Sequence, residues 1–81
     1  MDEPEFPPID FTTLVLSMST NCMAHLGEAP HGQVNLPMAQ QMIDILDLLE
    51  RKTAGNLTGE EERILSQVLV DLREAFGSHA A

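Results

Sequence analysis

Apolar residues recur at steps of three and four between Phe11 and Leu26, which is the spacing of one face of an α-helix. This segment carries no Asp, Glu, Lys or Arg, although acidic residues are frequent in the rest of the chain. Asp10 is the candidate N-cap, and Gly27 is the candidate stop after the last turn. The pattern predicts a helix over residues 11–26 that the rest of the fold or another chain must cover.

Two further helices with the same periodicity are predicted. The second covers residues 36–52, begins after the capping residue Asn35 and carries an apolar stripe that widens at its edges. The third covers residues 59–76 and begins with a capping box formed by Thr58 and Glu61. No segment has the alternating pattern of a strand, so the expected fold class is all-α.

Proline and glycine set the expected ends of the domain. Residues 1–9 contain three prolines and three acidic residues, and we expect them to form a flexible acidic tail. Gly77 is expected to stop the third helix and to leave residues 78–81 frayed, so that residues 10–77 form a single helical domain. Gly55 is expected to adopt a positive φ in the turn before the third helix.

Three helices with short connections predict a three-helix bundle, in which the second and third helices form a hairpin and the apolar first helix packs on it. Leu14 is expected to widen the buried stripe of the first helix. Six apolar residues fall outside the main stripes: Leu16, Met23, Met38, Ile45, Leu48 and Val70. We expect a homodimer that covers these six side chains. The alternative is that they are exposed singly, as apolar side chains often are on protein surfaces.

The composition narrows the classes of partner. The chain has 81 residues, a formal net charge of -9 at pH 7 and a sequence pI near 4.4. This charge argues against nucleic acid, which requires clustered Lys and Arg, and against an anionic membrane surface. The N-terminus is acidic where a signal peptide is basic, and the first helix is too short and too polar to span a bilayer. Cys22 is the only cysteine, which fits a reducing compartment, and we expect a cytoplasmic protein.

One string of residues has the composition of a metal site. Cys22, His25, Glu28 and His31 are spaced three apart, and zinc accepts all three residue types as ligands. Cys22 and His25, however, fall on the main apolar stripe of the first helix, where core packing is the favoured interpretation. We therefore expect no bound metal and no other cofactor. A redox-sensing thiol at Cys22, with His25 one turn away, is a further alternative.

Six blocks of sequence, taken together, carry a family resemblance: FTTLVLS (Phe11–Ser17), HLGE (His25–Glu28), NLPMAQQMIDIL (Asn35–Leu46), KTAGNLT (Lys52–Thr58), EE (Glu61–Glu62) and DLR (Asp71–Arg73). The block KTAGNLT is the most specific of them. Through these blocks, residues 11–73 resemble a small uncharacterised bacterial family that is classed as a domain of unknown function. The resemblance implies a cytoplasmic, all-helical domain, and it implies no activity and no ligand.

The function expected from the sequence is that of a non-enzymatic interaction or oligomerisation module. Its first expected partner is a second copy of the chain, and another protein is the alternative. A thiol- or metal-based sensor that uses Cys22 and His25 is the second hypothesis. An enzyme is the third, because no nucleophile elbow, phosphate-binding loop or paired carboxylates accompany His25 as a general base.

Overall fold

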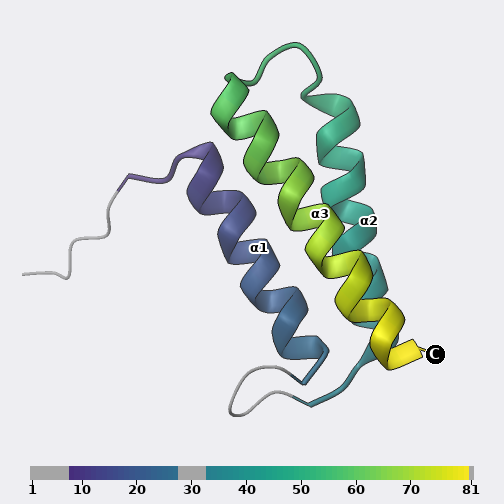
Figure 1. The fold of residues 1–81 in the computed structure, drawn as a ribbon. Helices are drawn as coiled ribbons and strands as arrows, with labels where there is room; N and C mark the ends of the chain where they lie inside the picture. The colour runs from purple at the N-terminus through teal and green to yellow at the C-terminus, as the bar shows by residue number, and fades with distance from the viewer. Residues whose placement is uncertain (1–7, 28–32, 81) are drawn as a thin grey trace, which may run out of the picture.

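The structure is a computed structural model, and it describes residues 8–27 and 33–80 of the chain. Within these residues the chain forms three helices, α1 (Phe11–His25), α2 (Leu36–Lys52) and α3 (Gly59–Ala80), as Figure 1 shows. The all-α class and the three-helix bundle are confirmed, and α2 has the predicted bounds. The dimer stays a prediction, and most of the predicted acidic tail lies outside the described residues.

The first two helices begin at the predicted capping side chains. The Asp10 carboxylate Oδ1 accepts a hydrogen bond from the backbone N–H of Thr13 at 2.7 Å, which satisfies one of the free donors at the start of α1. The Asn35 side-chain oxygen does the same for α2, where it accepts from the backbone N–H of Met38 at 3.1 Å. Local sequence chemistry therefore fixes where both helices start.

The start of α3 follows the sequence prediction, but its end does not. Thr58 Oγ1 accepts from the Glu61 N–H at 3.1 Å, and Glu61 Oε1 accepts from the Thr58 N–H at 2.8 Å, so the predicted capping box is formed. The predicted stop at Gly77 is wrong, because α3 continues through this residue to Ala80. Glycine costs a helix only about 1 kcal/mol relative to alanine, so a helix can continue through it. The neighbouring Phe76 packs against the core.

Two glycines adopt a left-handed backbone conformation, which the sequence predicted for Gly55; Gly27 is the predicted stop after the first helix. Gly27 follows α1 with a φ of 83°, and Gly55 lies between α2 and α3 with a φ of 86°. A Cβ placed on Gly27 would lie 3.0 Å from Cγ2 of Val34, so the chain passes close to itself where it leaves α1. The backbone N–H of Asn35 also donates to the carbonyl of His25 at 2.6 Å, which holds the end of α1 beside the start of α2.

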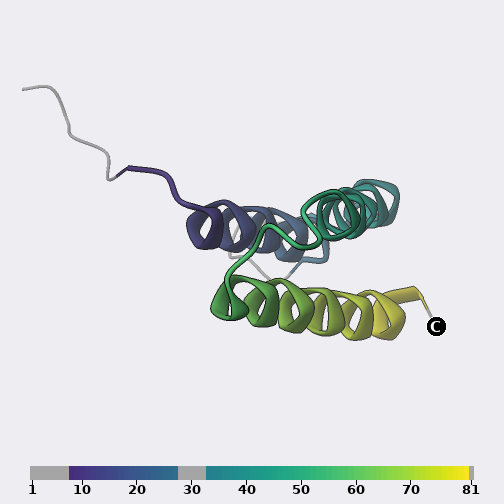
Figure 2. The ribbon, with the colours of Figure 1, turned by 90° about the horizontal axis from the view of Figure 1, so that it is seen from above.

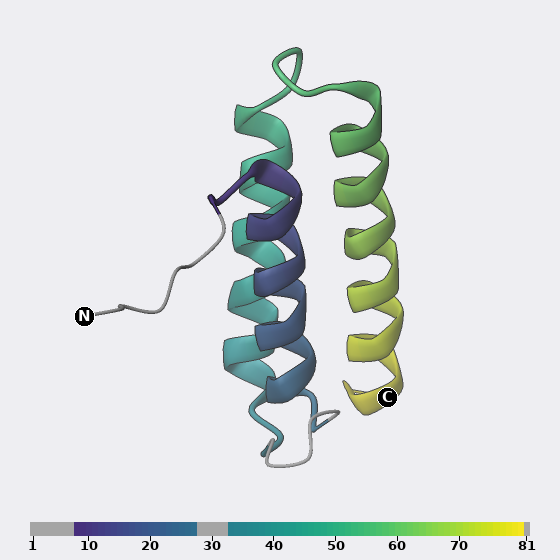
Figure 3. The same cartoon turned by 90° about the vertical axis from the view of Figure 1, so that its left-hand side faces the viewer.

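The three helices form two layers. In Figure 2, α1 and α2 lie side by side, and α3 packs across one side of them. Figure 3 gives the same arrangement from the side of α1, with α1 in front of α2 and α3 next to both. α1 and α3 run in the same direction, whereas α2 runs in the opposite one (Figure 1). α3 therefore covers one side of the layer that α1 and α2 form, and no helix within residues 8–27 and 33–80 covers the other.

The core lies where the three helices meet. Its fully or almost fully buried side chains come from every helix and from the residue that follows α1: Val15, Cys22, Leu26, Ala39, Ile43, Leu46, Leu65, Val68, Leu69 and Leu72. Leu57, in the turn before α3, packs against this core. No helix in the described part of the chain has the length and the hydropathy that crossing a membrane requires.

Replacing glycine by alanine is expected to have opposite effects at two positions. Gly27→Ala forces a positive φ on an L residue and brings a Cβ against Val34, so the free energy of unfolding should fall by about 1–2 kcal/mol or more. Gly77→Ala adds a Cβ in open space within a helix, so the free energy of unfolding should rise by up to about 1 kcal/mol. Urea denaturation of both variants measures the free energy of unfolding. A Gly77→Ala variant that is less stable than the parent would contradict the helical conformation of Gly77.

The two capping residues are expected to differ in their response to pH. The hydrogen bonds from Thr13 lower the pKa of Asp10 below the usual value of 3.8. The folded state therefore holds this proton less tightly than the unfolded state, so the cap contributes stability above pH 3.8 that is lost as pH falls through the lowered pKa.

Thermal unfolding of two alanine variants between neutral pH and about pH 2 tests this difference. The gap in Tm between the parent protein and Asp10→Ala should shrink below pH 3.8. The gap for Asn35→Ala should stay constant, because the amide has no proton to gain. A pH dependence of the same size in both variants would assign the effect to other groups.

Candidate interaction surface

Several large apolar side chains remain partly exposed on the folded chain. On α1 and α2 these include Leu14, Met38, Ile45 and Leu48, with exposed fractions between 38% and 46%. Leu16 on α1 is 48% exposed, and Val70 on α3 is 49% exposed. Singly exposed apolar residues need no explanation, so the relevant question is which of these side chains share one side of the molecule.

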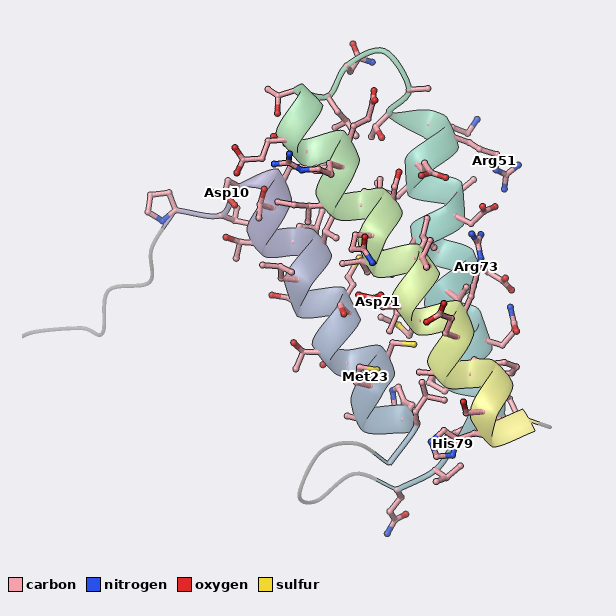
Figure 4. All side chains as sticks on the ribbon, viewed as in Figure 1. Asp10, Met23, Arg51, Asp71, Arg73 and His79 are labelled. Atoms are coloured by element: carbon pink, nitrogen blue, oxygen red, sulfur yellow. The ribbon has the colours of Figure 1, made fainter. Side chains whose placement is uncertain are left out.

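Two residues show how α1 is oriented. Met23 packs against the core and lies on the side of α1 that faces the viewer in Figure 4, which is the side where α3 lies. Leu16 precedes Met23 by seven residues and therefore lies on the same side of the helix. Leu14 precedes Leu16 by two residues, which turns it about 200° around the helix axis. Leu14 therefore lies on the side of α1 that α3 does not cover.

Two polar contacts with α3 show how α2 is oriented. The Oδ1 of Asp47 accepts a hydrogen bond from Arg73 Nη2 at 3.0 Å, and Glu50 accepts one from the hydroxyl of Ser66. Asp47 therefore lies on the side of α2 that faces α3. Ile45 precedes Asp47 by two residues and thus lies about 200° away. Met38, seven residues before Ile45, shares that uncovered side, and Leu48 follows Ile45 by three residues and borders it.

We call the outer surface of this layer the α1/α2 face and define it by Leu14, Met38, Ile45 and Leu48. The exposed polar residues that share its two helical stripes are Ser17, Asn21, Gln41 and Lys52. None of these eight residues is acidic, although the chain carries 13 acidic residues. Two carboxylates border the face: Asp44 lies one turn before Leu48, and the N-cap Asp10 lies one turn before Leu14. The face is therefore apolar at its centre, and its carboxylates lie at its edges.

Five of the six residues predicted as an interface are exposed, namely Leu16, Met38, Ile45, Leu48 and Val70, and whether they form an interface stays a prediction. They do not all share one side, since Leu16 lies on the α3 side of α1. Met23 packs against the core, although the sequence pattern places it outside the main apolar stripe of the first helix. Sequence analysis missed Leu14 as an exposed residue. The polar residues Ser17 and Asn21 on its flank are the signal that could have identified it.

Cys22 occupies the centre of the core. Its side chain has no exposed surface, and its Sγ donates to the backbone carbonyl of Ala39 at 3.5 Å. Burial raises the pKa of the Cys22 thiol, so the reactive thiolate is disfavoured. In this conformation the side chain acts as a small apolar group that lets α1 approach α2 closely.

The four residues considered as metal ligands are only partly described. Glu28 and His31 lie outside the described residues, and the Cys22 side chain points into the core. His25, which is half-buried, ends α1 with its carbonyl bonded to the Asn35 N–H. Among the residues that the structure does describe, no three His, Cys, Asp or Glu side chains are grouped so that they could hold a metal ion.

The burial of Cys22 predicts a slow thiol. We expect iodoacetamide to label Cys22 in the native protein at least about 100-fold more slowly than in guanidinium chloride, because labelling requires the core to open. Mass spectrometry of quenched samples follows the reaction, and the denatured chain serves as the control for full reactivity. Equal rates in the two states would show that the thiol is accessible in solution.

The comparisons with known proteins identify a family but no characterised relative. A family model described as a domain of unknown function, DUF1844, matches residues 8–78. Searches of the curated proteins and of the solved structures return no match to the chain. The matched segment contains all three helices except the last residues of α3. The chain therefore belongs to the DUF1844 family of domains of unknown function.

Proposed function

We propose that this domain is a non-enzymatic helical interaction module that binds a protein partner through the α1/α2 face. One observation supports this most strongly: partly exposed apolar side chains from two helices gather on one side whose centre lacks carboxylates, in a chain with a net charge of -9. Long-range repulsion keeps such a chain soluble. The centre of the face is apolar and its stripes carry one charge, at Lys52, so the face can be dehydrated at little electrostatic cost.

The exposed apolar area sets the strength of binding that this face can support. Fully burying a large aliphatic side chain is worth about 1.5–3 kcal/mol, so covering the exposed part of four such side chains gives roughly 2–5 kcal/mol. An equal contribution from the partner doubles this figure, and association entropy removes about 4 kcal/mol or more. The expected complexes are therefore weak and reversible, with dissociation constants of about tens of micromolar or higher.

The other hypotheses receive less support from the geometry. A sensor needs a thiol that its oxidant or metal can reach, whereas Cys22 is buried and its hydrogen bond goes to a backbone carbonyl. The proposal assigns no catalytic step and no cofactor to the domain. It places the module in the cytoplasm, without nucleic acid or membrane as a partner, on the basis of charge and cysteine content.

Affinity capture from a lysate of the native cells tests the proposal with two matched variants. Leu48→Glu places a carboxylate on the α1/α2 face, whereas Val70→Glu makes the same change at an exposed site on α3. Proteins retained by the parent domain, including untagged copies of itself, should be lost with Leu48→Glu and kept with Val70→Glu. Circular dichroism checks that both variants are folded. Retention that is the same for the parent and both variants would overturn the proposal.

A further inference from the structure

The partner of the α1/α2 face follows from the pattern of residues along α2, and this step rests on the function proposed above. We propose that the face binds a second copy of this chain, with the two α2 helices antiparallel and Ile45 of each copy close to a two-fold axis. In such an arrangement the two uncovered layers lie face to face, and each α3 remains on the outside.

The exposed stripe of α2 has the spacing of a helix that pairs with another helix. Met38, Gln41, Ile45, Leu48 and Lys52 follow one another at alternating steps of three and four. Met38 and Lys52 lie seven residues to either side of Ile45, so antiparallel pairing about Ile45 places Ile45 against itself and Met38 against Lys52 of the second copy. Gln41, four residues before Ile45, then comes near Leu48, three residues after it, with an offset of one residue. Each contact occurs twice, which is the property of a self-complementary two-fold interface.

Charge favours a second copy at this face over a charged partner. Two chains with a net charge of -9 repel each other at long range, and they can approach only through surfaces without carboxylates. The carboxylates Asp47 and Glu50 lie on the α3 side of α2, away from the α1/α2 face. A basic partner would find its counter-charges on that other side. The face itself matches a surface that is equally uncharged, and the same chain supplies one.

The position of Lys52 determines the direction of pairing. It is the only charged residue in the stripe and lies at one end of α2. Parallel pairing would place the two Lys52 side chains against each other, whereas antiparallel pairing about Ile45 separates them by about 20 Å. This distance exceeds two Debye lengths of about 8 Å each at physiological ionic strength, so the repulsion between them is screened. The antiparallel arrangement thus removes the one like-charge contact in the stripe.

The size of the face is sufficient for a reversible dimer. α2 has 17 residues and α1 has 15, so the layer is about 25 Å long and, with two helices side by side, about 20 Å wide. Two such surfaces bury about 1,000 Å² or somewhat more in total, which is the lower limit for a specific interface. The dimer should therefore dissociate on dilution rather than remain permanent.

Sedimentation equilibrium of the purified chain between about 10 μM and 2 mM tests the proposal. The mean mass should rise with concentration from 8.9 kDa towards twice that value. Ile45→Glu should lower the association constant by at least about 100-fold, because it buries two carboxylates near the axis, while Val70→Glu should leave it unchanged. A parent chain that stays monomeric at the highest concentration, or an Ile45→Glu variant that associates like the parent, would overturn it.

Disulfide cross-linking tests the direction of pairing. A mixture of Met38→Cys and Lys52→Cys chains should yield a cross-linked heterodimer under mild oxidation, because antiparallel pairing brings these positions together. Lys52→Cys alone should yield no cross-linked dimer beyond the background of the parent chain, whose Cys22 is buried. Efficient cross-linking of Lys52→Cys alone would show parallel pairing and would overturn the proposed geometry.

The two proposals can fail separately. If the purified parent chain stays monomeric but its capture of another protein depends on Leu48, the second copy is the wrong partner and the interaction module stands. If capture does not depend on Leu48 and the chain stays monomeric, both proposals are wrong.

Discussion

Close packing of α1 against α2 is the constraint on which the rest of the structure depends. The Cys22 thiol reaches the carbonyl of Ala39 at 3.5 Å, and neither residue has any exposed surface. Such an approach requires small side chains on both helices, and cysteine and alanine provide them. The hydrogen bond between the Asn35 N–H and the His25 carbonyl holds the same two helices together where the chain reverses. Together these contacts make α1 and α2 a single layer.

The described part of the chain covers one side of that layer. Among the described helices, α3 alone remains after the layer has formed, and it buries its apolar stripe against one side. The polar contacts between helices follow this division, since Arg73 and Ser66 of α3 bond to carboxylates on the α3 side of α2. Small domains leave a large share of their surface apolar because they have too little chain to enclose it. The uncovered α1/α2 face is thus a consequence of length as well as of sequence.

The local features of this fold could be predicted from the sequence, and the orientation of the helices could not. Capping by Asp10, Asn35 and the Thr58–Glu61 pair depends on residues three apart, so the sequence contains the whole interaction. Gly77 misled the prediction because the same residue type stops helices and is tolerated within them, so the residue type alone does not distinguish the two outcomes.

The α1/α2 face was predicted only in part, because the orientation of the helices could not be predicted from the sequence. Helical periodicity places Leu14 and Leu16 on opposite flanks of the α1 stripe, but it does not show which flank another helix covers. Only the position of α3 shows that one flank is covered and that the other is not. The stripe on α2 was visible in the sequence, because Met38, Ile45 and Leu48 fall outside the buried stripe whatever the position of the third helix.

The net charge of the chain and its apolar face act over different distances, and this difference determines how the proposed module would associate. Repulsion between two acidic chains extends over about one Debye length, whereas burial of apolar surface acts only on contact. Collisions in most orientations are therefore unproductive, because they bring carboxylates of α2 or α3 together. Only an approach through the α1/α2 face exchanges water for apolar contact without that cost. In the module that we propose, the acidity of the chain, which at first indicates only solubility, therefore also directs association towards the apolar centre of the α1/α2 face.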